Sequence, residues 1–77
     1  MICTIISPQK TANYKNVTSI ILPAASGQVQ VLSGHAEAFF LLNEGELFLE
    51  IGEKGLKAIT IEAAECYVKN DQVKIIL

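Results

Sequence analysis

The stretch "VTSIILPAASGQVQVL" (17–32) carries the pattern that decides the fold class. Its first part, "VTSIIL" (17–22), is rich in β-branched residues, which pack well on a pleated sheet and lose side-chain freedom in a helix. Its last part, "QVQVL" (28–32), alternates glutamine with valine, so one face is polar and the other apolar. Pro23 and the small-residue turn "AASG" (24–27) separate the two parts. The stretch therefore predicts two strands joined by a turn.

Similar short segments recur on both sides of this stretch, and none has the apolar stripe of a helix. They are "ICTII" (2–6), "EAFFLL" (37–42), "LFLEI" (47–51), "LKAITI" (56–61), "ECYV" (65–68) and "QVKIIL" (72–77). Short strands with frequent turn signals are typical of all-β sandwiches and barrels. We therefore expect one all-β domain over residues 1–77, a small antiparallel β-sandwich or flattened barrel of about eight strands.

The chain is more apolar than so small a core requires. A domain of this size buries only about 60% of its unfolded surface, yet 51% of the residues are hydrophobic. The segments "IIL" (20–22), "FFLL" (39–42) and "IIL" (75–77) do not alternate, so both faces of these strands are apolar. They either lie in a closed barrel or bend through a bulge, or they present an outer sheet face to another protein. We favour the docking interpretation.

Several functional classes are disfavoured by composition. The six basic residues are all lysines, without a basic patch, which argues against nucleic-acid binding. Cys3, Cys66 and His35 are too few for a zinc site, so no metal or other cofactor is expected. The cysteines fit as small apolar strand residues, and a disulfide between them stays possible. No leader pattern and no apolar run of about 20 residues occurs, which predicts a soluble, intracellular chain.

Catalytic residues are not expected. His35 is the only histidine and lies near Ser33, but a Ser-x-His spacing does not make a triad, and no G-x-S-x-G sequence is present. Four glutamates near two turns are best explained as solvated side chains; they are Glu44, Glu46, Glu50 and Glu53. The single histidine followed by "EGELFLEIG" (44–52) leaves a metal-free, cupin-like domain that binds a small ligand as an alternative.

An ordered set of landmarks resembles the amino-terminal β-sandwich domain of the epsilon subunit of F-type ATP synthases, called delta in mitochondria. The landmarks are a first strand ending in Ser7-Pro8, "VTSIILP" (17–23), "LSGHA" (32–36) in place of a Leu-Pro-Gly-His-Ala signature, "LNEG" (42–45), and a closing "NDQVKIIL" (70–77). Their order and spacing fit over essentially the whole chain.

The chain departs from the family pattern at identifiable positions. Ser33 replaces a proline before Gly34, Gln30 replaces a glycine, and Glu62-Ala63-Ala64 replaces a Ser-Gly-Gly. Many members also continue into a carboxy-terminal helical hairpin, whereas this sequence stops at Leu77. Hairpin functions are therefore not transferred to these residues, and a divergent β-sandwich interaction module stays an alternative.

The resemblance implies a non-catalytic rotor component. In the family, this domain lies at the foot of the central stalk, held by the gamma subunit and resting on the membrane-embedded c ring. It helps to couple proton flow to ATP synthesis, on the cytoplasmic face of the inner (plasma) membrane, with membrane association only through the complex. By match to the family pattern, the c-ring contacts would be Gln28, Ser33, Gly34 and His35. Weaker candidates for the gamma contact are Phe39, Phe40 and Leu42, although some of them must instead fill the core.

Overall fold

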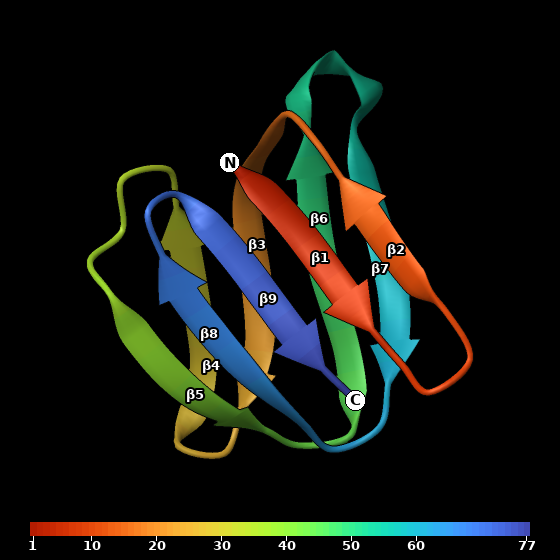
Figure 1. Ribbon diagram of the computed structural model, residues 1–77. Helices are drawn as coiled ribbons and strands as arrows, with labels where there is room; N and C mark the ends of the chain where they lie inside the picture. The colour runs from red at the N-terminus through yellow and green to blue at the C-terminus, as the bar shows by residue number, and fades with distance from the viewer.

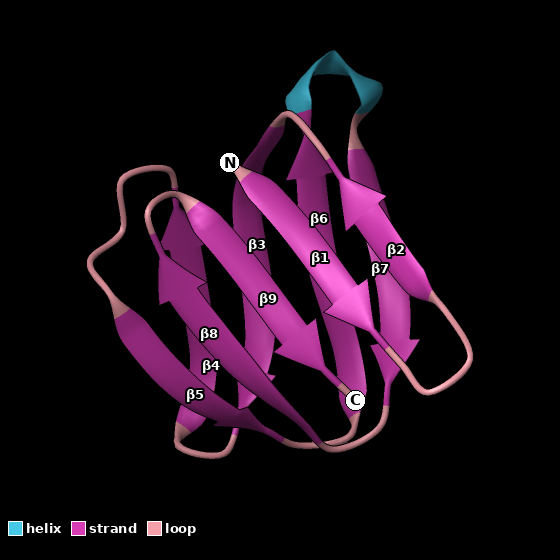
Figure 2. Cartoon of the chain, viewed as in Figure 1, coloured by secondary structure: helices cyan, strands magenta, loops and turns pink.

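The structure is a computed structural model that describes residues 1–77, and nearly all of it is β-strand (Figures 1 and 2). The strands are β1 (Ile2–Ile6), β2 (Thr11–Tyr14), β3 (Val17–Ala24), β4 (Gly27–Leu32), β5 (Ala38–Leu42), β6 (Gly45–Ile51), β7 (Leu56–Ile61), β8 (Ala64–Lys69) and β9 (Gln72–Ile76). One turn of 3₁₀-helix, η1 (Gly52–Lys54), connects β6 to β7. No helix of the structure is long and apolar enough to cross a membrane. The predicted all-β class is confirmed.

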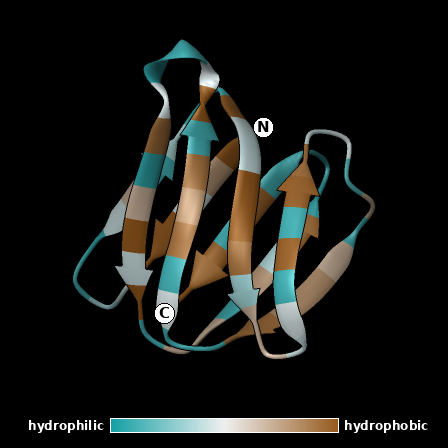
Figure 3. Cartoon of the chain, turned by 180° about the vertical axis from the view of Figure 1, so that it is seen from behind, coloured by the Kyte–Doolittle hydropathy of each residue, from teal (hydrophilic) through white to brown (hydrophobic).

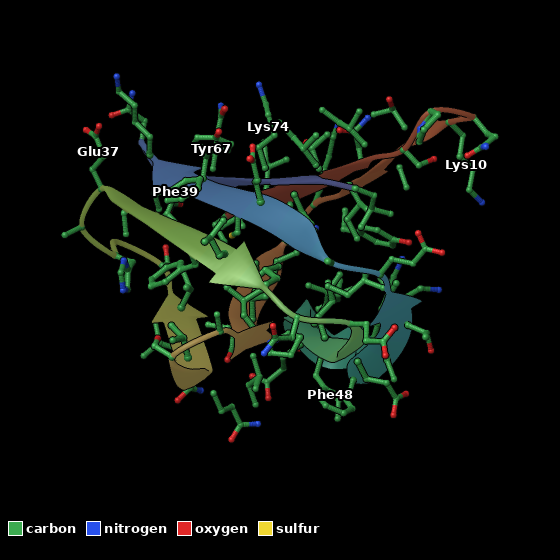
Figure 4. All side chains as sticks on the ribbon, turned by 90° about the horizontal axis from the view of Figure 1, so that it is seen from below. Lys10, Glu37, Phe39, Phe48, Tyr67 and Lys74 are labelled. Carbon is green, nitrogen blue, oxygen red and sulfur yellow. The ribbon has the colours of Figure 1, made fainter.

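One continuous sheet folds over to form two layers. Its strand order is β2-β1-β9-β8-β5-β3-β6-β7, and β4 pairs with β3. The sheet turns at β5 and β3, which share only the pair Ala24–Leu42. In Figure 1, β2, β1, β9 and β8 lie in front of β3, β6 and β7, and Figure 4 shows the layers nearly edge-on. All pairings are antiparallel except that of β1 with β9, the first and last strands, which is parallel.

The core lies between the two layers and follows from alternation along the strands. β8 and β9 each bury every second residue, and Figure 3 shows hydrophilic and hydrophobic segments alternating along strands of the rear layer. The core contains Cys3, Ile5, Val17, Ile20, Leu22, Ala24, Val31, Leu42, Leu47, Leu49, Ile61, Ala64, Cys66, Val68, Val73 and Ile75. The one buried polar residue, Ser19, accepts a hydrogen bond from Gln30 Nε2 at 3.0 Å. Every buried polar side-chain atom has a partner.

Both cysteines are free thiols in this core, as expected for small apolar strand residues. Burial raises the pKa of Cys3 to about 12, with a further contribution from nearby Cys66. Burial also raises the pKa of Cys66 to about 11. Neither thiol is therefore ionised in the folded protein near neutral pH, and a thiolate is the form that reacts or binds metal.

Two strand boundaries differ from the prediction. The structure has nine strands, one more than the eight segments predicted from the sequence, and the additional strand is β2 (Thr11–Tyr14). This strand lies at the sheet edge, and its pattern of half-buried Ala12 and Tyr14 carries little apolar signal. β3 also continues through Pro23 to Ala24 instead of ending before the proline. Proline is tolerated here because it lies near the strand end, where its carbonyl still accepts a hydrogen bond from Asn43 N at 2.9 Å.

Candidate functional site

The segment Leu32–His35, between β4 and β5, forms a tight turn that exposes polar groups. The His35 amide donates to the Leu32 carbonyl at 3.1 Å, which closes a four-residue turn. Gly34 has φ +81°, the value that the third position of a type II turn requires and that glycine adopts without strain. The second position of a type II turn favours proline. Ser33 at that position keeps the same turn but adds a hydroxyl group.

Asp71 holds this turn from a distant part of the sequence. Its Oδ1 accepts hydrogen bonds from the Gly34 amide at 2.9 Å and from Ser33 Oγ at 3.0 Å. Its Oδ2 lies 3.6 Å from the α-amino group of Met1. The Gly34 hydrogen bond first, and the Ser33 hydrogen bond second, lower the pKa of Asp71 from its ordinary value. Sequence reasoning missed this residue.

The His35 side chain is oriented by two neighbours. Its Nδ1 lies 2.7 Å from the Ala36 carbonyl, which can only accept a hydrogen bond, so Nδ1 donates. Its ring meets the Phe40 ring edge-on, with centroids 6.4 Å apart. In the neutral ring, Nε2 is then left as an acceptor for a donor outside the chain. These contacts preset one ring orientation before any partner binds.

Gln28 is not brought to this turn. It lies at the beginning of β4, paired with Pro23, whereas Ser33 follows the other end of the strand. Five residues of extended strand separate the two by about 16 Å. The structure therefore gathers Ser33, Gly34 and His35 just beyond the end of β4 and leaves Gln28 near the beginning of that strand, whose course is shown in Figure 1.

A second exposed surface, the Phe39 patch, consists of Phe39, Leu41 and Tyr67 on the outer face of β5 and β8. Phe39 is 49% exposed and Leu41 57% exposed. Phe39 and Tyr67 are paired across the two strands, and their rings are in contact at a tilt of 55° with centroids 5.0 Å apart. Figure 4 shows both on the outer side of one layer and Phe48 on the outer side of the other. Leu41 and Tyr67 were not predicted from the sequence.

The other two predicted contact residues of β5 point inward. Leu42 is only 3% exposed and belongs to the core, so its prediction as a surface contact was wrong. Phe40 is half-buried and packs against the core. The physical reason is the two-residue period of a strand, which places Phe39 and Leu41 on one face and Phe40 and Leu42 on the other. The run "FFLL" hid this alternation because all four residues are apolar.

The exposed acidic side chains and the single histidine do not form a metal-binding cluster. No group of three or more His, Cys, Asp or Glu residues lies close enough to hold a metal ion. Glu44, Glu46, Glu50 and Glu53, which were interpreted as solvated side chains, are all exposed. The arrangement offers two surfaces, a polar turn and an apolar patch, on one rigid sandwich.

Comparison with known proteins agrees with this fold. The family model for the ATP synthase delta/epsilon chain, β-sandwich domain, matches residues 1–77. The chain belongs to this family. The ATP synthase epsilon chain of Prochloron didemni is 36% identical over 73 residues, covering 95% of this chain and 53% of the relative. That of Leptospira borgpetersenii is 34% identical over 73 residues, covering 95% and 57%. The family match gives no support to the cupin-like alternative.

A solved structure shares the fold at low sequence identity. The central stalk and c ring of the Tetrahymena thermophila mitochondrial ATP synthase contains a chain with a TM-score of 0.82. The match covers 99% of this chain and 61% of that one, at 14% identity, and therefore shows the fold alone. The chain spans about half the length of the curated relatives it matches. The family assignment accordingly concerns the β-sandwich domain.

Proposed function

We propose that this chain acts as a non-catalytic rotor component of a proton-translocating ATP synthase, linking the gamma subunit to the c ring. It would couple ring rotation to ATP synthesis at distant catalytic sites, as a peripheral subunit on the cytoplasmic face of the inner (plasma) membrane. The observation that carries the proposal is the presence of two chemically different exposed surfaces on one small sandwich. A coupling element needs such an arrangement because it must hold two partners at once.

The Leu32–His35 turn is the proposed contact to the c ring. It is exposed and polar, and its conformation is preset by hydrogen bonds. A preset turn loses little conformational freedom on binding, which favours affinity. Gln28 would join this contact only if the ring surface extends along β4, because it lies at the other end of that strand.

The Phe39 patch is the proposed contact to the gamma subunit. Large exposed aromatic side chains are enriched at the centres of protein interfaces. Beside Leu41, the small residues of the β3–β4 turn line a shallow groove of about 310 Å³; they are Ala24, Ala25 and Ser26. Phe40 supports the patch from below, through its packing on the core.

The ring contact is tested with His35→Glu in a reconstitution of the chain with its cognate c ring. The substitution replaces a neutral ring acceptor with a charged carboxylate that would have to be desolvated in the contact, and we expect ring binding to fall by about tenfold, equal to ~1.4 kcal/mol. Lys10→Glu is the matched control, because Lys10 is exposed in the β1–β2 turn. Figure 4 shows it far from Glu37, which follows His35 by two residues. Unchanged ring binding by the folded His35→Glu protein would remove the turn from this interface.

The gamma contact is tested by calorimetric titration of the chain with the gamma subunit of the same organism. We expect saturable one-to-one binding that Leu41→Asp weakens by at least about tenfold, since a charge would be desolvated in the apolar patch. Leu56→Asp is the control, because Leu56 is a strand leucine exposed to a similar degree, 65%, but lies on β7. Equal effects of both variants, or no binding by the parent chain, would contradict the proposed contact.

A further inference from the structure

We propose that Asp71 is a positioning residue that fixes the Leu32–His35 turn in its binding conformation, so that the β8–β9 turn controls how the polar turn meets a partner. The proposal rests on the function proposed above, because it deepens the account of the same surface. It concerns a residue that lies 37 positions from Gly34 in the sequence. Two observations support it: Ser33 and Gly34 both donate hydrogen bonds to the Asp71 carboxylate, and the conformation of the β8–β9 turn fixes the position of Asp71.

The contacts of the carboxylate are directed at the backbone of the polar turn. The Gly34 amide would otherwise point to solvent, but it donates to Asp71 Oδ1 at 2.9 Å. Ser33 Oγ lies 3.0 Å from Oδ1 and 3.3 Å from Oδ2. Hydrogen bonds to a charged acceptor are stronger than neutral ones. Both central residues of the polar turn are therefore fixed by the same side chain.

The backbone around Asp71 is also well suited to this role. Lys69 and Gln72 are paired in the β8–β9 ladder, with only Asn70 and Asp71 between them. These two residues have φ of 52° and 59°, as in a two-residue type I′ hairpin turn. Asn, Asp and Gly tolerate this conformation best. Asp71 is the member of that group that supplies a charged acceptor, and the rigid hairpin fixes where the carboxylate lies.

A main-chain hydrogen bond also connects the β8–β9 turn, which carries Asp71, to strand β1. The Ile2 amide donates to the Asp71 carbonyl at 3.2 Å, and β1 pairs with β9 from Ile2 onward. The carboxylate thus projects from the junction of two paired strands, and it reaches a turn that follows a third strand, β4. To move, the Leu32–His35 turn would have to break its hydrogen bonds to the Asp71 carboxylate. The hydrogen bonds between the strands of the sheet would not change.

The anchoring is tested on the 77-residue chain by NMR measurement of Gly34 amide exchange. Asp71→Gly keeps the left-handed backbone and removes the acceptor, whereas Asp71→Asn keeps both the backbone and an acceptor oxygen. We expect roughly five- to tenfold faster exchange in Asp71→Gly, as loss of one hydrogen bond implies, and a smaller increase in Asp71→Asn, because a neutral acceptor holds the Gly34 amide more weakly. Glu62→Gly, which removes an exposed acidic residue from the β7–β8 turn, is the matched control. Parent-like exchange in Asp71→Gly would overturn the proposal.

Two further readouts separate anchoring from general stability. In the parent chain, the Gly34 amide signal should move at acid pH as Asp71 is protonated, and Asp71→Asn should abolish this movement; a signal that does not move in the parent chain would overturn the proposal. Ser33→Ala leaves the β8–β9 turn intact, so it tests the same contact if Asp71→Gly folds poorly. Ser33 Oγ and the Gly34 amide donate to the same Asp71 oxygen, so loss of the Ser33 hydrogen bond should loosen the carboxylate. We expect Gly34 amide exchange in this variant to be about twofold faster or more. Unchanged exchange in Ser33→Ala would count against the proposal.

The consequence for binding is measured with the c ring, using the same variants beside His35→Glu. Asp71→Gly should weaken ring binding by about three- to tenfold, the effect of having to order a loosened loop. Asp71→Asn should weaken it less, because it keeps an acceptor oxygen for the Gly34 amide. If His35→Glu weakens binding and Asp71→Gly does not, the positioning role is wrong although the ring contact stands. If neither variant alters binding while Gly34 exchange responds to Asp71→Gly, the proposed ring contact is wrong and the anchoring alone stands.

Discussion

The interior of the sandwich and the Leu32–His35 turn are held together by different kinds of interaction. The interior is a cluster of sixteen buried residues with few polar atoms, stabilised by burial, which depends little on direction. The turn exposes Ser33 and Gly34 and half-exposes His35, and it is fixed by a few directed hydrogen bonds that end largely on one carboxylate. Substitutions in the interior should therefore change stability, whereas substitutions at the turn should change recognition and leave the fold intact.

The largest effect is expected from a cavity in the interior. Leu49 is fully buried on β6 and is paired with Ile20 on β3. Leu49→Ala should lower the free energy of unfolding by about 2–5 kcal/mol, through lost burial and the cavity that remains. Urea unfolding followed by circular dichroism measures this loss, with an unchanged denaturant slope.

Leu56→Ala is the control for this cavity, because it removes the same atoms from an exposed position. Its effect should stay within about 0.5 kcal/mol. Similar losses in the two variants would show that burial between the layers is not the main source of stability.

The next effect concerns the two thiols and the pH at which the interior weakens. Their pKa values are raised by burial above the ordinary 9.0, to about 12 and about 11. The unfolded chain ionises first as pH rises, so this contribution to stability is complete below pH 9 and is lost between pH 9 and about 12, with the part from Cys66 lost by about pH 11. Unfolding free energies measured at pH 8 and pH 10.5 should therefore fall more steeply in the parent chain than in a Cys3→Ala/Cys66→Ala double variant. An equal fall in both proteins would mean that other groups cause the alkaline loss.

The interior was also the more predictable of the two regions. β-Branched composition and two-residue alternation are local signals, and they located eight of the nine strands that the structure contains. The exception, β2, is an edge strand with little apolar surface to reveal it. Where every residue of a strand is apolar, as in β5, the strand was found but its inner and outer faces could not be distinguished, which explains the wrong assignment of Leu42.

The functional turn was only half predictable, for a different reason. Gly34 signalled a tight turn because of its backbone freedom, and the family resemblance drew attention to Ser33 and His35. The contact of Gly34 with Asp71 joins segments 37 residues apart. It depends on the pairing of β9 with β1, which brings the β8–β9 turn close to the turn that follows β4. No local pattern carries that information. A two-residue hairpin turn at Asn70-Asp71 could have been anticipated, but not the donors that its carboxylate would meet.

Apart from the Leu56→Ala control, the smallest effect on stability is expected at Gly34, which is also the sharpest test of the comparison. Open space surrounds the position of an added Cβ, so a side chain there meets no neighbour. The cost of Gly34→Ala should come from the backbone alone, about 1–2 kcal/mol for an alanine held at positive φ. Gly34→Asn should cost less, because asparagine tolerates this conformation. Urea unfolding of the two variants, beside their c-ring binding, separates backbone strain from surface chemistry. If Ala and Asn are equally costly, the strain argument fails; if Ala unfolds like the parent chain, the turn relaxes to another conformation and the directed hydrogen bonds do not fix it.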